Sequence, residues 1–372
     1  MFLFHQVKIS FLSFALIFTA IFGGKTFAQD SSAKQKSSSE IRTEFFAYPY
    51  VFYTPEKKFA FGGGGILSMQ DTSRSLSKPS KFVFSAYYTT ANQFLIYLNP
   101  EFYFDEEKYL LTGIFWVERL IEKFYGYGSA TDEIDEPFYK LFDFTANISA
   151  NYAFTQGFLI GAQYYFENVS RLDLMQNPIF ENENILGEEG GINSGLGIRF
   201  FYDSRDNIFY PSEGFYDEVQ VTYFSKAFGG NYDFNSYLID IRNYFSLSEN
   251  QILAVEAYFN AVYGSPPFYS FPKLGGHRRM RGYYEGRFRD KTYYAIQTEL
   301  RSFIYWRLYG VVFAGVGDVF GNFDNFTTKN IKPSYGVGLR FRLDEQEKIN
   351  IRLDIGFGKN TNGVYFQVEE AF

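Results

Sequence analysis

The stretch FTANISANYAFTQGFLIGAQYYF, residues 144–166, carries no charged side chain, and its average hydropathy alone would suggest a membrane helix. Its period is that of a β-strand, because apolar and polar residues alternate on both sides of Gln156 and Gly157. The polar positions of the first half include Asn147, Ser149 and Asn151. The apolar positions are Ile148, Ala150, Tyr152, Phe154, Phe158, Ile160, Ala162, Tyr164 and Phe166. This pattern predicts a β-hairpin with one apolar face on both strands.

The same alternation recurs along the chain, for example over residues 94–105, 336–343 and 349–358. In each segment one face carries Asn, Arg, Asp, Glu or Gly, and the other carries aliphatic side chains or aromatic rings. The 372 residues include 47 Phe and 32 Tyr, so these faces hold a heavy aromatic load. Such a face is buried either in the core of a soluble sandwich or, in an outer-membrane barrel, against lipid.

The N-terminus favours the barrel because it has the layout of an export signal. Lys8 precedes an uncharged run over residues 9–22, and Thr26, Phe27 and Ala28 follow, with small residues at the first and third of these positions, which predicts a signal peptide over residues 1–28. A retained membrane anchor is the alternative, but the run is shorter than the ~20 residues that a spanning helix needs. Residues 29–41 are polar and Ser-rich, and we expect a flexible periplasmic leader there, followed by the barrel over residues 42–372.

Composition excludes several classes of function. The chain has no Cys, so it forms no disulfides, and its net charge of −7 argues against a nucleic-acid partner. His277 is the one histidine outside residues 1–28, which argues against an enzyme, a histidine-based metal site and a bound cofactor. The basic run HRRMR, residues 277–281, is then expected to face a lumen or its rim.

We therefore expect an all-β protein, a transmembrane antiparallel β-barrel in the outer membrane. Closure is required in lipid, since an open sheet edge would leave backbone groups without partners. The predicted strands span 42–54, 57–69, 80–90, 92–104, 107–120, 137–155, 157–169, 189–204, 212–226, 231–247, 248–265, 291–306, 307–318, 331–343, 348–358 and 363–372. These are about 16 strands, an even number that places both chain ends on the periplasmic side and makes 266–290 the sixth surface loop.

Several short motifs follow one another in a recognisable order. They are YDSRDNIFYPSEG at 202–214, MRGYYEGRFRD at 280–290, AIQTELRS at 295–302, GVVFAGVGDVFG at 310–321 and the terminal Phe372. This succession resembles the bacterial surface antigen family, the barrel domain shared by BamA, TamA and the two-partner secretion transporters. The resemblance implies that the sixth surface loop folds into the lumen, where acidic side chains of two neighbouring strands hold its arginine.

Carried over to this sequence, the loop motif is Arg281, Gly282 and Tyr283, with Gly286 and Arg287 following, and the strand acid is Glu299. The next strand departs from the family pattern, because Gly315 stands where an aspartate is usual. Asp318 lies nearby, but its parity along the strand is opposite. We therefore expect Arg281 to depend mainly on Glu299, with one charged partner missing.

Two further sites come from the same comparison. Asp203, Arg205, Asp206, Pro211 and Gly214 form the aspartate-rich stretch, which we interpret as an ion-pair network that fixes a periplasmic turn. Phe366, Val368 and Phe372 resemble the C-terminal signal that the outer-membrane assembly machinery recognises during insertion. Glu370 lies where that signal would have an apolar residue.

The resemblance implies a role in outer-membrane biogenesis or in protein or lipid translocation. Family members that insert or secrete proteins carry polypeptide-transport-associated domains before the barrel, for which residues 29–41 leave no room. We therefore expect a separate periplasmic partner, besides outer-membrane lipids and the assembly machinery, and a weakly paired seam between the first and last strands. The alternative is a passive diffusion pore, and a barrel lipase or protease is a third class that the scarcity of histidine disfavours.

Overall fold

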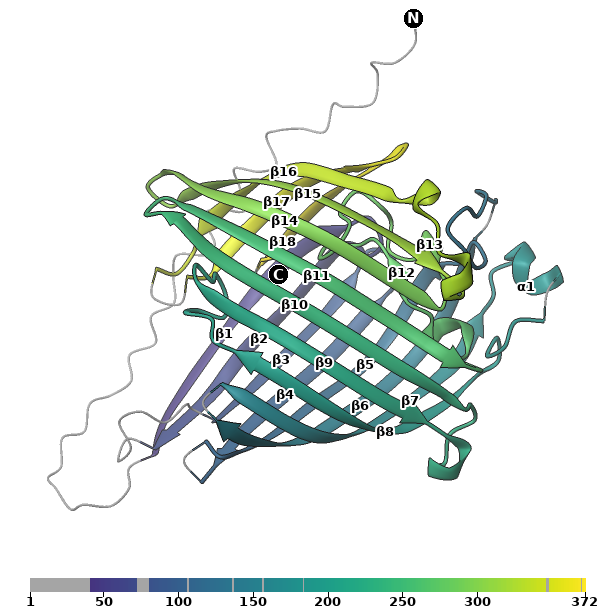
Figure 1. Ribbon diagram of the computed structural model, residues 1–372, viewed down its shortest axis with the longest axis horizontal. Coiled ribbons are helices and arrows are strands. Elements are labelled where there is room, and N and C mark those ends of the chain that lie inside the picture. The colour runs from purple at the N-terminus through teal and green to yellow at the C-terminus, as the bar shows by residue number, and fades with distance from the viewer. Residues whose placement is uncertain are drawn as a thin grey trace, which may run out of the picture. The chain divides into compact units, whose positions relative to one another are not determined.

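A computed structural model describes residues 41–71 and 80–372, apart from 106, 136, 156, 183, 346, 347 and 369. The predicted signal peptide and residues 29–40 of the predicted leader lie outside the described residues. Sixteen antiparallel strands form one closed barrel, in which each strand pairs with the next along the chain except where β11 pairs with β14 (Figure 1). The predicted fold class and strand number are confirmed.

The element bounds agree closely with the predicted ranges. The barrel strands are β1 (Ile41–Thr54), β2 (Lys58–Asp71), β3 (Ser80–Thr89), β4 (Phe94–Phe104), β5 (Tyr109–Lys123), β6 (Phe138–Thr155), β7 (Phe158–Asp173), β8 (Gly190–Asp203), β9 (Gly214–Phe224), β10 (Phe234–Ser248), β11 (Gln251–Gly264), β14 (Thr292–Tyr305), β15 (Leu308–Phe320), β16 (Lys332–Arg342), β17 (Asn350–Gly358) and β18 (Thr361–Val368). A separate small sheet pairs β12 (Lys273–Leu274) with β13 (Phe288–Arg289). The helical elements are α1 (Pro178–Asn182), η1 (Lys226–Phe228), η2 (Phe268–Ser270), η3 (Phe323–Asn325) and η4 (Thr328–Asn330).

The two faces of the barrel wall follow the alternation in the sequence. Outward positions carry apolar side chains that remain exposed, such as Ile198 at 54% and Val337 at 54%. Inward positions carry buried polar or charged side chains, such as Asp143, Gln163 and Thr222. This is the arrangement of a barrel whose outer wall contacts hydrocarbon. In the part of the chain that the structure describes, no helix has the length and apolarity needed to cross a membrane.

The barrel has a near end, where β1 begins and β18 ends, and a far end, where residues 265–291 connect β11 to β14. The predicted topology places the near end in the periplasm. Residues 265–291 are called the lumen segment below, because their contacts lie on inward-facing side chains of the wall.

The last strand is shorter than predicted. β18 ends at Val368, and Ala371 and Phe372 turn inward, where they pack in one buried cluster with Tyr244 and Ala254. The predicted strand 363–372 was therefore right as far as Val368 and wrong beyond it. Glu370 explains why the strand ends early. Inside the barrel its carboxylate accepts hydrogen bonds from Arg340 and Asn350, whereas on the outer wall it would face lipid.

Closure between β18 and β1 is weak in the described residues. Tyr53 pairs with Phe366, and no other position of the two strands is paired. By contrast, β1 pairs with β2 continuously from Ile41 opposite Asp71 to Thr54 opposite Lys58. Tyr53 lies at the far end of β1 and Phe366 lies close to the end of β18, so the two strands are staggered. We call this junction the seam.

Candidate functional site

The lumen segment lies against the inner wall formed by β16, β17 and β18. The hydroxyl of Ser334 donates to the backbone carbonyl of Arg281 at 2.5 Å, and the amide of Gly282 donates to the Tyr365 hydroxyl at 2.9 Å. The hydroxyl of Tyr283 donates to the carbonyl of Pro333 at 3.0 Å. Two backbone groups of this irregular segment thus find partners on inward-facing side chains, as buried backbone requires, and the Tyr283 side chain binds the wall backbone in turn.

Two glycines allow this close approach. Gly282 has φ +108°, and a Cβ atom there would lie 2.6 Å from the carbonyl carbon of Phe357. On the wall, a Cβ atom at Gly356 would lie 2.7 Å from the carbonyl carbon of Arg281. Glycine is needed on both sides because a side chain on either would separate the segment from β17.

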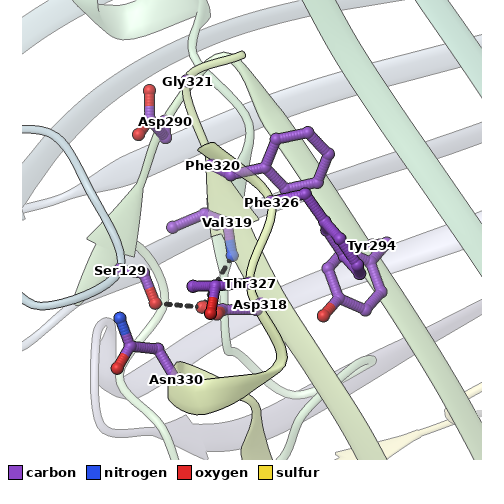
Figure 2. Close-up of a pocket in the computed structure, with 10 residues that line it drawn as sticks. All are labelled: Ser129, Asp290, Tyr294, Asp318, Val319, Phe320, Gly321, Phe326, Thr327 and Asn330. Atoms are coloured by element: carbon purple, nitrogen blue, oxygen red, sulfur yellow. Dashed lines mark hydrogen bonds between the residues drawn. The ribbon is translucent and has the colours of Figure 1, made fainter. Parts of the chain in front are cut away.

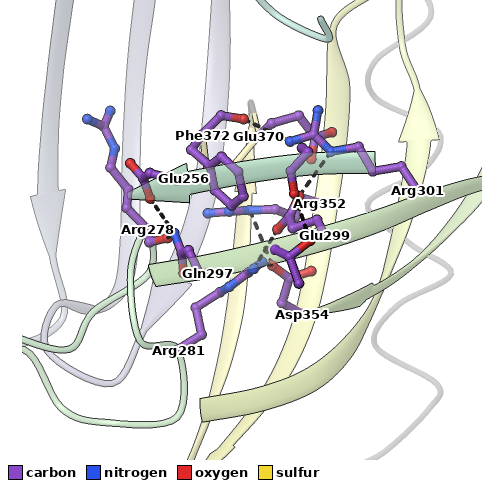
Figure 3. Close-up of polar contacts among 12 residues, drawn as sticks. Glu256, Arg278, Arg281, Gln297, Glu299, Arg301, Arg352, Asp354, Glu370 and Phe372 are labelled. Carbon is purple, nitrogen blue, oxygen red and sulfur yellow. Dashed lines mark hydrogen bonds and ion pairs between the residues drawn. The ribbon is translucent and has the colours of Figure 1, made fainter. Parts of the chain in front are cut away.

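Arg281 is fully buried and pairs with two carboxylates (Figure 3). One terminal nitrogen donates to Glu299 on β14, and the other donates to Asp354 on β17 at 2.6 Å. The Phe313 ring lies beneath the guanidinium, with its centroid 3.6 Å from the central carbon. A charge-assisted pair on each side and an aromatic face below hold the planar group in one orientation.

Arg281 and its two carboxylates belong to a larger set of buried charges, which we call the arginine network. It consists of Arg281, Arg301, Arg340, Arg352, Glu299, Asp354 and Glu370. Arg301 donates to Glu299 at 3.0 Å and to the backbone oxygen of Phe372 at 2.8 Å. Arg340 donates to Asp354 and, at 2.6 Å, to Glu370. The network therefore joins the lumen segment, three wall strands and the C-terminal residues into one unit.

Burial of so many charges is tolerated only while each has partners. Removing one member of a buried ion pair costs about 3–5 kcal/mol, because the remaining charge stays desolvated. The network consequently fixes the position of the lumen segment more than it adds to stability overall.

The structure corrects the expectation that one charged partner of Arg281 is missing. Asp354 on β17 supplies the second carboxylate, two strands away from the Gly315 position where the family pattern places one. Asp318 has no contact with Arg281 and instead accepts from Lys332 at 2.6 Å and from Ser129 at 2.5 Å. Its carboxylate lies in the wall of a cavity of about 120 Å³ at the far end (Figure 2).

Gly286 and Arg287 lie further along the lumen segment. Gly286 has φ +80° and its amide donates to the carbonyl of Leu274, which closes the hairpin of β12 and β13. Arg287 donates to the side chain of Thr131 at 2.8 Å and lies over the Tyr125 ring. Arg287 thus attaches the segment to the far-end loop between β5 and β6, whereas Gly286 serves the segment's own hairpin.

The aspartate-rich stretch forms the connection between β8 and β9. Arg205 donates to Asp203 at 2.9 and 2.7 Å, and Asp206 accepts from the amides of Ser212 and Glu213. Pro211 is buried. Gly214 has φ +102°, and a Cβ atom there would lie 2.3 Å from the carbonyl oxygen of Ser204.

The three residues of the C-terminal motif lie in different surroundings. Phe366 is half-buried and pairs with Leu353 and, across the seam, with Tyr53. Val368 pairs with Ile351 at the last position of β18. Phe372 lies inside the barrel, with its ring 5.7 Å from the Arg301 guanidinium.

A second cavity, of about 290 Å³, lies between the lumen segment and the inner faces of β11 and β14. Its basic lining residues are Lys273, His277, Arg278 and Arg279, and Glu285 is the one carboxylate among its lining residues. Burial raises the pKa of the Glu285 carboxyl to about 7, with nearby Lys273 acting in the opposite direction. Burial, and then the positive charge of Arg278, lower the pKa of His277 well below its ordinary value. We call this space the basic cavity. In the described ranges, no three His, Cys, Asp or Glu side chains gather in a way that could hold a metal ion.

Comparison with known proteins agrees with this architecture. The Omp85 superfamily domain matches residues 80–372. This chain belongs to the Omp85 superfamily. The match covers most of the barrel, from β3 to β18, and includes the lumen segment. Barrels of this fold and family belong to the bacterial outer membrane. No curated protein matches the chain in sequence.

Two solved structures share the fold at low identity. BamA from Haemophilus ducreyi, in a crystal structure lacking POTRA domains 1–3, gives a TM-score of 0.59 at 13% identity, over 88% of this chain and 70% of that chain. CdiB from Acinetobacter baumannii gives 0.57 at 12% identity, over 87% of this Omp85 chain and 59% of CdiB. The Omp85 chain therefore spans little more than half of CdiB.

Sequence reasoning missed Asp354, although its signal was present. The segment 349–358 alternates, and Asp354 shares its polar face with Arg352 and Gly356. A carboxylate on the polar face of a barrel strand points into the lumen, where the arginine of the lumen segment is one of the cations to be balanced. A search of all polar faces, instead of one strand only, would have found it.

Proposed function

We propose that this Omp85 barrel acts in outer-membrane biogenesis or in protein or lipid translocation, and that the seam between β1 and β18 is the lateral exit. The observation that carries this proposal is the pairing of the seam at Tyr53 and Phe366, beside continuous pairing between β1 and β2. A junction with few backbone hydrogen bonds opens at low free-energy cost, whereas a full ladder does not.

The lumen contacts support the same role. The arginine network holds the lumen segment against β14, β16 and β17, so that side of the wall stays rigid while the seam separates. The inward turn at Ala371 and Phe372 removes the C-terminal residues from the outer edge, where they would otherwise extend the pairing with β1. We further propose that a separate periplasmic protein brings the client to the near end.

A disulfide across the seam tests the proposal. The chain has no Cys, so the pair Tyr53→Cys and Phe366→Cys is the sole possible crosslink. Locking it should abolish the function in cells that depend on this barrel, measured as outer-membrane protein levels and antibiotic exclusion, and a reductant should restore both.

The control is an equally outward-facing pair on a continuous ladder, Val221→Cys with Tyr237→Cys. This crosslink should leave both measurements unchanged, because β9 and β10 have no need to separate. Full activity of the locked seam would contradict the proposal.

A passive diffusion pore makes the opposite prediction. It would conduct ions steadily in planar bilayers, and the seam crosslink would change neither the conductance nor the cellular phenotype. Deletion of residues 277–290 should open a large conductance if the lumen segment obstructs the barrel, and should change little if the pore is already open.

A further inference from the structure

The basic cavity holds a cation that no protein group neutralises. Among the described residues, Arg278 makes no ion pair, and its side chain is exposed in the lining of the cavity. Its backbone is fixed, since the carbonyl of Arg278 accepts from the Gln297 side chain at 3.0 Å. In Figure 3 the Arg278 guanidinium points away from the arginine network.

The neighbouring cations are already paired, which distinguishes Arg278 from them. Lys273 donates to both oxygens of Glu122 at 2.6 Å. Arg279 donates to Glu256 at 2.7 Å and to Asp240 at 2.8 Å, and it stacks on the Tyr258 ring at 3.6 Å. The ion pairs of Lys273 and Arg279 therefore hold the wall around Arg278 in place without a ligand.

A second group in the lining can bind an anion beside Arg278. His277 lines the same cavity, and burial together with the positive charge of Arg278 lowers the pKa of its imidazole, which is therefore neutral. A neutral imidazole donates a hydrogen bond from one of its two ring nitrogens.

We propose that the basic cavity binds a phosphate monoester, with Arg278 pairing with the phosphate oxygens and His277 completing the contacts. The planar guanidinium presents paired donors that match phosphate oxygens. The volume of about 290 Å³ is several times that of a single water, about 30 Å³, so the cavity accommodates the phosphate together with part of its organic substituent.

Glu285 is compatible with an anion in this place. Because burial raises the pKa of its carboxyl to about 7, a large fraction of the molecules carry it protonated at neutral pH. A protonated carboxyl donates a hydrogen bond to phosphate instead of repelling it. This site goes beyond the proposed translocation role and does not depend on the seam.

The test is binding to the purified, folded barrel in detergent. Glucose 6-phosphate should bind saturably by calorimetry while glucose does not, and Arg278→Gln should weaken binding about tenfold or more. His277→Ala should weaken it less, since it removes one neutral hydrogen bond. The matched control is Arg287→Gln, which lies on the same segment outside the cavity and should bind as the unchanged protein does.

Two arms distinguish the source of the phosphate. Binding of glucose 6-phosphate alone identifies a soluble ester, and binding of a short-chain phosphatidic acid alone identifies a lipid headgroup. Binding of both shows that the site recognises the phosphate group itself. Broadening of the ³¹P signal of each probe, lost in Arg278→Gln, serves where the heat of binding is small. Absence of saturable binding of either probe below about 10 mM, or equal binding by Arg278→Gln, overturns the proposal.

Discussion

Strand β18 is held differently along its two edges. Toward β17 it pairs continuously from Val368 opposite Ile351 to Thr361 opposite Gly358, and the arginine network lies behind that pairing. Toward β1 it pairs at Phe366. The barrel is therefore not closed equally around its circumference. The β17 edge of β18 is fixed by a continuous backbone ladder and by buried ion pairs, and the β1 edge has little of either.

The largest effect should follow from breaking the network at its centre. Arg281→Ala leaves Glu299 and Asp354 buried with one cation fewer, and we expect a loss of about 3–5 kcal/mol in the free energy of unfolding. The temperature at which the folded band disappears on a semi-native gel measures it. Arg287→Ala is the control, with an expected loss below about 1 kcal/mol because that side chain is partly exposed. Equal loss in both variants would show that Arg281 has no special role.

A smaller loss should follow from separating the lumen segment from β17 without changing charge. Gly282→Ala adds a methyl group 2.6 Å from the Phe357 backbone at a positive φ, and we expect about 2–3 kcal/mol of destabilisation. Gly229→Ala has a similarly positive φ, +88°, but nothing within 4 Å of the added atom, so it isolates backbone strain alone. Equal unfolding temperatures would mean that the segment does not press against the wall.

The third prediction concerns pH. The folded-state pKa of Glu285 is raised to about 7, so its protonated form is favoured on folding. Stability from this group is present below the unfolded pKa of about 4.3 and is lost as pH rises to 7. The Glu285→Gln variant has no carboxyl at this position and does not lose this stability. The difference in the free energy of unfolding, variant minus unchanged protein, should therefore increase by on the order of 2 kcal/mol between pH 4.5 and 7. Urea titrations at pH 5 and pH 8 measure the difference, and a difference that is the same at both values would refute the shift.

The smallest free-energy difference lies at the seam itself. Amides of β1 should exchange with deuterium at least about tenfold faster than those of β2, because β2 is paired along both edges. Mass spectrometry of peptides covering 43–53 and 59–69 compares them directly. The Tyr53→Cys and Phe366→Cys crosslink should narrow the gap, and equal protection before crosslinking would mean that the seam is closed.

Much of the barrel could be predicted because lipid on one side and a polar lumen on the other impose a period of two on every strand. The hairpin over residues 138–173 followed from that alternation alone. The short β12 and β13 pair could not be found in this way, since two-residue strands carry no period. Asp354 and Phe372 were misjudged for a related reason: side chains converge in the lumen from strands distant in sequence, and local spacing does not report which of them meet.

The inward turn of Glu370, Ala371 and Phe372 has a practical consequence for handling the protein. Anything fused after Phe372 would start inside the barrel, beside Arg301 and Tyr244, and would compete with the contacts that these residues make. An affinity tag is better inserted in the far-end loop at Gly229, where the backbone turns and open space surrounds the position.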